Sequence, residues 1–251
     1  KRLEAGLDCL LLTRRAGAPL LTQEGVQLVG YARRILSLHD EAILSLSKQP
    51  LSGKIKLGMT EDTTSSDLSR ILGRFVRLHP SVSVRTQVRQ SLELEEALQT
   101  GEIDLAVMQL FIHRLRETDL RLYDDHLCWV KARDLVLDFD QSLPFLAYDA
   151  KCFYKDWAMD AVQSVDVILE TVLECASSAG IVSGVQAGLG IALLSSQNVT
   201  SEMEVIADKL PPPPGVTFAV RQSRKARSKP VATLAGEIAR AGAQPQRLTA
   251  A

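Results

Sequence analysis

The amino-terminal segment constrains the fold most, because it places three recognisable elements in a short stretch of chain. Residues 1–7 space their leucines as a helix does, with basic side chains exposed. Residues 10–15 and 19–22 predict two short strands around a turn of small residues, and Thr22 is a favourable N-cap for a following helix. This order predicts that residues 1–22 form the end of a recognition helix and the wing of a winged helix-turn-helix domain.

A more specific pattern runs through the same segment. The chain reads Leu3-Glu4, Leu7-Asp8, Leu11-Leu12, Arg14 and then Leu21-Thr22-Gln23-Glu24-Gly25. This order resembles the signature of the LysR-type bacterial transcriptional regulators, in which Leu-Glu, Leu-Gly, Leu-Phe and Arg precede Leu-Thr and Ala-Gly. Asp8, Leu12 and Glu24 stand where the family has Gly, Phe and Ala. The family's first two helices would lie before Lys1, so we expect a fragment or a chain with a disordered start.

Basic and hydroxyl side chains of this segment are candidates for contacts with DNA. The resemblance implies double-stranded operator DNA as a partner, with Arg14 and Arg15 on the wing and Thr22 at a helix start, all three contacting phosphate. Lys1 and Arg2 lie on the short first helix. The net charge of −1 argues against nonspecific coating of nucleic acid but permits a local basic patch.

The composition is that of an ordinary soluble globular protein. With 251 residues, 46% apolar and 24% charged, the chain has room for about two domains. No apolar run approaches the roughly 18 residues of a membrane span, and no signal peptide opens the chain, so we expect a cytoplasmic protein without a membrane partner. The cysteines form no CxxC pair and no zinc-spaced cluster, which predicts reduced thiols and no metal site: Cys9, Cys128, Cys152 and Cys175.

Residues 22–48 predict one long helix, and we assign residues 23–50 to a linker. Apolar or small residues recur there in alternating steps of three and four, which is a seven-residue repeat. The repeat predicts a subunit seam formed by Leu28, Ala32, Ile35, His39 and Ala42, with close backbone approach at Gly25 and Ala32. The resemblance implies the same seam in a dimer or tetramer. The alternatives are a core helix of a monomer and, for His39, a pH switch instead of a tolerated polar residue.

After the breakers Pro50 and Gly53 the chain has α/β character, and two successive strand-helix-strand units favour a parallel sheet. The expected strands are 54–59, 82–87, 105–108, 127–130, 143–148, 167–172, 191–194 and 216–220, and the expected helices are 65–79, 92–100, 154–162, 179–187 and 230–241. Residues 79–84 and 94–108 resemble the first effector subdomain of the same family.

The predicted fold class is therefore α/β. It combines a partial winged helix-turn-helix, a long linker helix and a two-subdomain effector domain like that of the periplasmic binding proteins, over residues 53–241. Subdomain I covers residues 53–124 and 218–241, and subdomain II covers residues 125–217. The chain would cross between them twice, near Tyr123–His126 and again near Thr217, to give a two-strand hinge.

Such a fold holds its ligand in the cleft outside the carboxyl ends of the parallel strands. The residues at those ends and at the facing helix starts are Thr60, Glu61, Asp62, Thr63, Thr64, Gln109, Leu110, Asp149, Phe153, Tyr154, Cys175, Ala176, Ser177 and Ser178. Helix-start amides favour an anion, and the resemblance implies a small effector, often a carboxylate, with no cofactor. Glu61 and Asp62 would repel an acid unless helix amides satisfy them, which leaves an amine-bearing or zwitterionic effector open. The threonines and serines could also be mere helix caps.

Other functions leave weaker marks on the sequence. Ser177 and Ser178 lie in no G-x-S-x-G motif, and the chain contains no HExxH and no P-loop, so we expect no enzyme. Gly188 and Gly190 could suggest a nucleotide loop, but a helix end followed by a buried strand fits them better. Cys175 at a helix start could be a redox sensor. A solute-binding protein with the same cleft is the other alternative.

Overall fold

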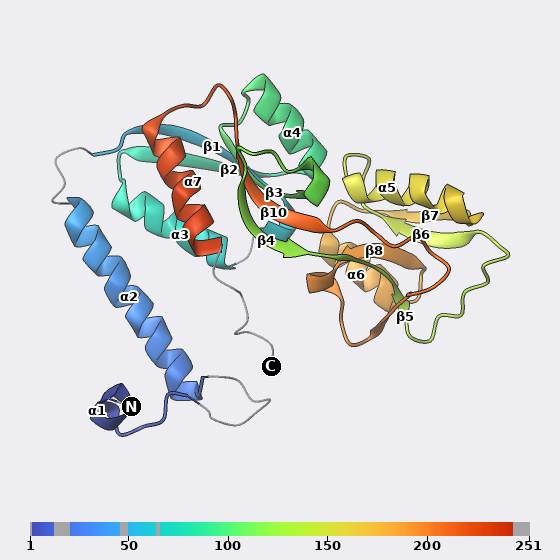
Figure 1. Cartoon of the computed structure of the whole chain (residues 1–251), viewed down its shortest axis with the longest axis horizontal. Helices are drawn as coiled ribbons and strands as arrows, with labels where there is room; N and C mark the ends of the chain where they lie inside the picture. Colours follow the sequence, from blue (N-terminus) through green and yellow to red (C-terminus); the bar gives the residue numbers. More distant parts are fainter. Residues whose placement is uncertain (1, 13–20, 46–49, 64–65, 243–251) are drawn as a thin grey trace.

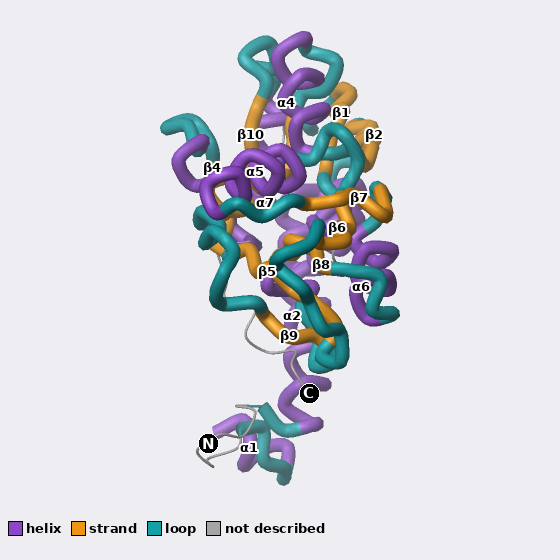
Figure 2. The backbone as a smooth tube through the Cα atoms, turned by 90° about the vertical axis from the view of Figure 1, so that its right-hand side faces the viewer, coloured by secondary structure: helices purple, strands orange, loops and turns teal. Residues whose placement is uncertain are grey.

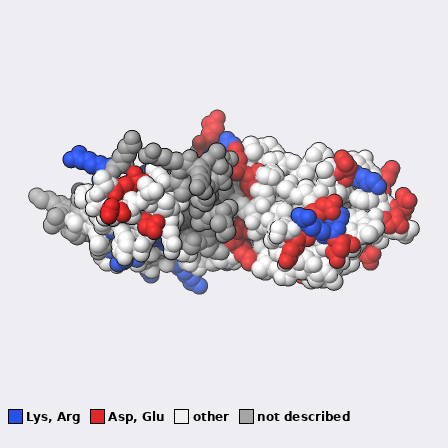
Figure 3. Space-filling view, turned by 90° about the horizontal axis from the view of Figure 1, so that it is seen from below, with Lys and Arg blue, Asp and Glu red and all other residues white. Residues whose placement is uncertain are grey.

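The computed structural model describes residues 2–12, 21–45, 50–63 and 66–242. Two α/β subdomains lie side by side, and a long helix connects them to a short amino-terminal helix that stands apart (Figure 1). The side view confirms that the amino-terminal part lies at one end of the molecule (Figure 2). Seen from below, acidic and basic side chains are mixed over the outer end of the second subdomain (Figure 3).

The amino-terminal part contains α1, Arg2–Leu7, and an antiparallel bridge between Leu12 and Leu21. This bridge is the portion of the expected hairpin that falls within the described residues. The turn of the hairpin, together with Lys1, Arg14 and Arg15, lies outside them. The expected DNA contacts of those three residues therefore stay predictions.

Thr22 caps the long helix, as its sequence position predicts. Its Oγ1 accepts a hydrogen bond from the Gly25 amide at 3.0 Å and donates one to the Leu10 carbonyl at 2.6 Å. Gly25 permits the close backbone approach that is expected there. A Cβ atom would come within 2.1 Å of the Leu11 carbonyl oxygen, so the start of the helix lies directly against the amino-terminal part.

The long helix α2, Gln23–Ser45, matches the expected helix over the residues described. It displays large apolar side chains to solvent: Val26, Tyr31, Ile35, Leu36 and Leu38. Ile35 is 66% exposed, and Ala32, His39 and Ala42 are also exposed, whereas Leu28 is half-buried. A core helix of a monomer would bury this stripe, so that alternative is wrong.

The first sheet has the strand order β2-β1-β3-β10-β4, with β2, β1 and β3 parallel and with β10 antiparallel to both of its neighbours. Its strands are β1 Gly53–Met59, β2 Val82–Val88, β3 Leu105–Phe111, β4 Leu120–Asp125 and β10 Val216–Gln222. Its helices are α3 Ser66–Leu78, α4 Ser91–Thr100 and α7 Lys229–Gly242, with short 3-10 turns at Glu61–Thr63 (η1) and Ile112–Arg114 (η2). The sequence had not predicted β4.

Alternation along β3 explains how the helices cover this sheet. Leu105 and Val107 pack into a core with α3 and α7, while Ala106 and Met108 pack on the other face with α4. Every residue of β3 is buried, as expected of a central strand with helices on both faces.

The second sheet has the order β7-β6-β8-β5-β9. Its strands are β5 Leu127–Ala132, β6 Leu143–Ala147, β7 Leu169–Glu174, β8 Ile191–Ser195 and the unpredicted β9 Met203–Val205. Its helices are α5 Phe153–Ala161 and α6 Ser178–Gln186, with 3-10 turns at Val162–Val165 (η3) and Ser196–Asn198 (η4). The chain enters this sheet through β4 and β5 and leaves it into β10, where Val216 pairs with Asp125. The two crossings therefore lie on neighbouring strands, as expected.

The Gly-x-Gly segment ends a helix. Gly188 follows α6 with φ of +74°, a left-handed conformation that glycine adopts without strain. Gly190 lies so close to the Pro144 carbonyl oxygen that an added Cβ atom would be 2.2 Å from it. The buried strand β8 follows directly. This confirms the helix end and buried strand, and a nucleotide loop is wrong.

A buried ion cluster fastens the edge of the first sheet. Arg221 on β10 is 2% exposed, and its guanidinium donates to the Asp119 carboxylate at 2.6 to 3.1 Å. The same group donates to Glu95 Oε1 at 2.5 Å and to the Arg114 carbonyl at 3.0 Å. The cluster joins β10 to α4 and to the loop before β4, with its cation and carboxylates in direct contact.

Candidate functional site

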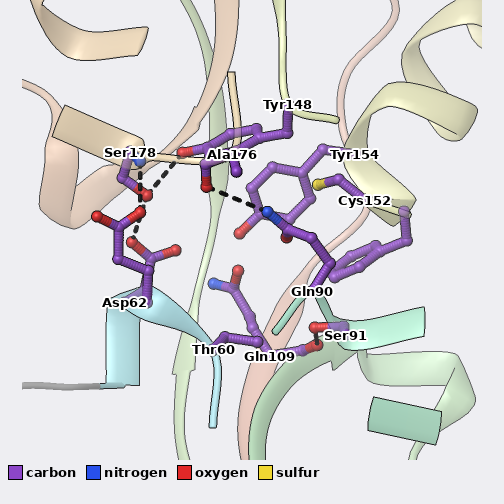
Figure 4. A pocket seen from close by; sticks show the side chains of 12 residues that line it. Thr60, Asp62, Gln90, Ser91, Gln109, Tyr148, Cys152, Tyr154, Ala176 and Ser178 are labelled. Atoms are coloured by element: carbon purple, nitrogen blue, oxygen red, sulfur yellow. Dashed lines mark hydrogen bonds between the residues drawn. The ribbon is translucent and has the colours of Figure 1, made fainter. Parts of the chain in front are cut away.

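A cavity lies between the two subdomains, at the carboxyl ends of the strands, with a volume of about 340 Å³ that includes the part open to solvent. Polar and aromatic side chains from both subdomains line it (Figure 4). They are Thr60, Glu61, Asp62, Gln90, Ser91, Gln109, Tyr148, Cys152, Phe153, Tyr154, Ala176 and Ser178.

The turn after β1 aims two carboxylates at the facing subdomain. Thr63 Oγ1 donates to the Thr60 carbonyl at 2.8 Å and to the Val107 carbonyl at 3.2 Å, which fixes the short η1 helix against β3. Glu61 and Asp62 lie on that helix. The orientation of these two carboxylates therefore depends on Thr63, which is buried and does not itself line the cavity.

Glu61 occupies the start of α6. Its Oε1 accepts from Ser177 Oγ at 2.9 Å, and its Oε2 accepts from the Ser178 amide at 2.6 Å. A helix N-terminus favours a negative charge because its first amides have no partner within the helix. The anion site that the sequence predicts at this helix is thus taken by a carboxylate of the protein itself.

Asp62 makes a second set of bonds across the cleft. Its Oδ1 accepts from Ser178 Oγ at 2.9 Å and from Asn198 Nδ2 at 3.1 Å. Tyr148 donates to the same Ser178 hydroxyl at 3.0 Å. Burial raises the pKa of Asp62 above its usual range, and the neighbouring carboxylate of Glu61 adds to that rise.

The mouth of the cavity is bridged as well. Gln90 Nε2, at the start of α4, donates to the Ala176 carbonyl at 3.2 Å. Lys151 and Glu96 form an ion pair at 3.0 Å between the two subdomains. In this arrangement the subdomains are joined both inside the cavity and at its edge.

Among the residues that the structure describes, three cavity-lining side chains carry buried polar atoms without a hydrogen-bond partner: Thr60 Oγ1, Gln109 Nε2 and Tyr154 Oη. Thr60 is 8% exposed, Gln109 2% and Tyr154 4%. Gln109 and Tyr154 point into the same space from opposite subdomains (Figure 4). Each buried unpartnered group costs about 1–3 kcal/mol, a cost that a bound polar molecule would offset.

The predicted site residues divide into two groups. Those that line the cavity are Thr60, Glu61, Asp62, Gln109, Phe153, Tyr154, Ala176 and Ser178. Those that the structure places outside its lining are Thr63, Leu110, Asp149, Cys175 and Ser177, and Thr64 lies outside the described residues. Ser177 still acts at the cavity through Glu61.

The residues outside the lining have other surroundings. Leu110 packs into the core beneath α4. Cys175 is half-buried beside the core of the second subdomain, and its sulfur accepts a hydrogen bond from the Ser177 amide at 3.4 Å. Neither lines this cavity, but Leu110 lines a smaller pocket that shares Gln109 and Phe153 with it. A part for Leu110 and Cys175 in binding an effector stays a prediction.

Four lining residues were missed by sequence reasoning: Gln90, Ser91, Tyr148 and Cys152. Gln90 and Ser91 follow β2, which is parallel to β1. Their place at the carboxyl end of a parallel strand is the sequence signal that points to this cavity. Burial raises the pKa of Cys152 to about 12, so its thiol stays protonated at neutral pH.

The comparisons with known proteins agree on one family. A model of the LysR substrate binding domain matches residues 48–243. The HTH-type transcriptional regulator PecT of Dickeya dadantii is 27% identical over 209 residues, which cover 83% of this chain and 66% of PecT. DgdR of Burkholderia cepacia, another HTH-type transcriptional regulator, is 28% identical over 240 residues, 95% of this chain and 81% of DgdR.

Solved structures show the same fold. The regulatory domain of CcmR from Synechocystis, in complex with 2-PG, aligns with 77% of this chain and 99% of its own at a TM-score of 0.60 and 18% identity. A full-length OxyR variant of Pseudomonas aeruginosa aligns with 96% of this chain and 87% of its own at a TM-score of 0.54 and 20% identity. Among the helices that the structure describes, none has the length and apolar character needed to cross a membrane.

Proposed function

We propose, from the premise that this chain belongs to the LysR family of transcriptional regulators, that it controls binding to operator DNA through a small molecule held between its two subdomains. The observation that carries the proposal is the cavity with three buried polar atoms that have no partner. The curated relatives are named as regulators, which supports regulation over solute transport. We propose that the protein acts in the cytoplasm and catalyses no reaction.

The mechanism is a shift between arrangements of the subdomains. A ligand that contacts both walls stabilises the arrangement in which those walls face each other, by its difference in affinity between the two states. Neighbouring strands β4 and β10 carry both crossings, so the movement has a defined place in the fold. In a dimer, such a movement changes the spacing of the two DNA-reading heads.

Self-association is the second part of the proposal. The exposed stripe on α2, which includes Ile35 and Leu36, supports a seam between subunits because contiguous exposed apolar patches mark interaction surfaces. Ala32→Glu would bury a carboxylate in that seam, and sedimentation should show loss of the dimer. Gln27→Glu is the control on the same helix, and a dimer that survives both changes would place the interface elsewhere.

DNA binding is proposed for the amino-terminal part. Neutralising Arg14 and Arg15 should lower affinity for operator and random DNA alike, and should reduce the salt dependence by about one counterion per lost contact. If random-DNA affinity stays unchanged while operator discrimination collapses, the phosphate assignment is wrong. The alternative of a redox sensor at Cys175 stays a prediction.

A screen tests the small-molecule part. The whole chain is heated with a library of polar metabolites, and a ligand should raise the melting temperature by mass action. Ala176→Trp should abolish that rise because the indole would block the mouth of the cavity, whereas Ala232→Trp, on the exposed side of α7, should leave it unchanged. A ligand that stabilises Ala176→Trp like the parent would place the site elsewhere.

A further inference from the structure

The cavity between the subdomains has a one-sided charge. Of the twelve described residues that line it, Glu61 and Asp62 carry acidic side chains, and none is a lysine, arginine or histidine. The bridging Lys151 lies at the edge and is already paired with Glu96. A molecule entering this space therefore meets a wall whose formal charges are all negative.

The position that best suits an anion is already filled. Ser177 Oγ and the Ser178 amide, which begin α6, both donate to Glu61. An anionic ligand would have to displace the Glu61 carboxylate from α6, and the two negative charges would then repel each other within the cavity. A cation faces neither obstacle, because both carboxylates attract it.

The unpartnered atoms define the rest of the ligand. Gln109 Nε2 can only donate, so it requires an acceptor such as a hydroxyl, carbonyl or carboxyl oxygen. The hydroxyls of Thr60 and Tyr154 can donate or accept. These atoms are nine-tenths buried or more and lie in the wall of the same cavity as Asp62.

The aromatic residues of the wall add a second attraction for positive charge. Tyr148 and Tyr154 pack edge to face with their ring centroids 5.6 Å apart, and Phe153 and Tyr154 do so at 4.7 Å. An ammonium group over such a ring is attracted by the negative face of the π-system, and the attraction grows when water is excluded.

We propose that this cavity binds a small amine, with its ammonium group against Asp62 and the tyrosine rings and an oxygen of the same molecule accepting from Gln109. The proposal rests on the proposed function, since it names the chemical class of the effector. A zwitterionic amino acid belongs to this class, whereas an acid without an amine does not.

The test compares probes that share a skeleton and differ in charge. Ethanolamine, ethylene glycol and glycolate, with longer homologues of each, are titrated into the whole chain by calorimetry. We expect at least one amine to bind roughly tenfold or more tightly than its diol and its hydroxy acid, as is typical of a hydrogen bond to a charged group. A hydroxy acid that binds more tightly than its amine would overturn the proposal.

Two variants sharpen the result. Asp62→Asn keeps the shape of the side chain and should remove the preference for the amine, while Glu61→Gln should raise the affinity for the hydroxy acids because it removes the internal anion from α6. Asp160→Asn, on the far end of α5, is the matched control. An unchanged preference in Asp62→Asn overturns the proposal.

Failure of this proposal can be told apart from failure of the proposed function. If no amine of the series binds at about 10 mM, a concentration at which even millimolar affinity would be detected, the amine class is wrong. A metabolite of another class that stabilises the parent but not Ala176→Trp would then preserve the effector site. Absence of any such metabolite would contradict both.

Discussion

Two groups of buried or half-buried charges in this protein are built in opposite ways. Arg221 lies within the first subdomain with its guanidinium bonded to Asp119 and Glu95, so positive and negative charges meet. Glu61 and Asp62 lie between the subdomains, where hydroxyl, amide and carboxamide groups donate to them. The mixed-charge cluster belongs to a rigid sheet edge, and the acidic pair lines a cavity. The comparison indicates that charges of one sign are placed together where a ligand of opposite charge can pair with them.

The largest expected effect tests the mixed-charge cluster. Arg221→Met removes the cation and leaves Asp119, whose side chain is 0% exposed, buried without its countercharge. Breaking a buried pair in this way typically costs about 3–5 kcal/mol of the free energy of unfolding. Urea denaturation followed by circular dichroism measures the loss. Arg240→Met, at an exposed position of α7, should change stability by less than about 0.5 kcal/mol. Equal losses in the two variants would show that the ion cluster does not account for the loss.

A matched pair of threonines tests the cavity wall. Thr63→Val removes two hydrogen bonds that hold η1 and should cost about 1–3 kcal/mol. Thr60→Val removes a hydroxyl that has no partner, so it should leave the ligand-free protein equally stable or slightly more stable. The same urea titration compares them. Should Thr60→Val lose as much stability as Thr63→Val, the hydroxyl has a partner in the folded protein.

The acidic pair predicts a distinct pH dependence. The folded protein raises the pKa of Asp62 above its ordinary value of 3.8, so the folded state holds that proton more tightly than the unfolded state. Its contribution to stability is therefore complete below pH 3.8 and is lost as the pH rises through the folded pKa. Burial is the main cause of the raised pKa, and repulsion from the carboxylates of Glu61 and Asp125 adds to it.

Asp62→Asn should remove this dependence. Relative to the parent, the variant should gain stability as the pH is raised from about 4 toward neutral, by less than Arg221→Met loses. Urea titrations of both proteins at several pH values provide the test. If the difference in the free energy of unfolding between the two proteins does not change with pH, the pKa of Asp62 is not raised in the folded state.

The smallest effect is expected at the mouth of the cavity. Lys151 and Glu96 are 48% and 65% exposed, and an ion pair at such a surface contributes about 0–1 kcal/mol. Lys151→Ala should therefore change stability little, and the difference should shrink further in high salt. A larger, salt-independent loss would show that this bridge holds the subdomains together.

Much of the fold could be predicted because its signals are local. Helix and strand periodicity and the breakers Pro50 and Gly53 predicted the elements, and the position of ligand sites at the carboxyl ends of parallel strands indicated Thr60 and Gln109. The two missed strands are an exposed edge strand, β4, and a strand of three residues, β9, whose patterns are too weak to recognise.

The charge arrangement could not be predicted because its partners are distant in sequence. Glu61 and Ser177 are separated by 116 positions, and Arg221 and Glu95 by 126. Arg221 is the one charged residue of β10, and the strand's sequence gives no indication of its partner. Glu61 was suspected of repelling an anion, but only the structure shows that it takes the anion's place.

The long helix α2 has a mechanical consequence. Its 23 residues make a rod about 35 Å long, which separates the ligand-binding part from α1. A rod of that length is a lever arm: tilting it by about 10° at one end displaces the other by about 6 Å. The Thr22 hydroxyl ties the far end of the lever to the Leu10 carbonyl, so the amino-terminal part travels with it. A rearrangement too small to alter either subdomain can thus be magnified to the scale of a base-pair step.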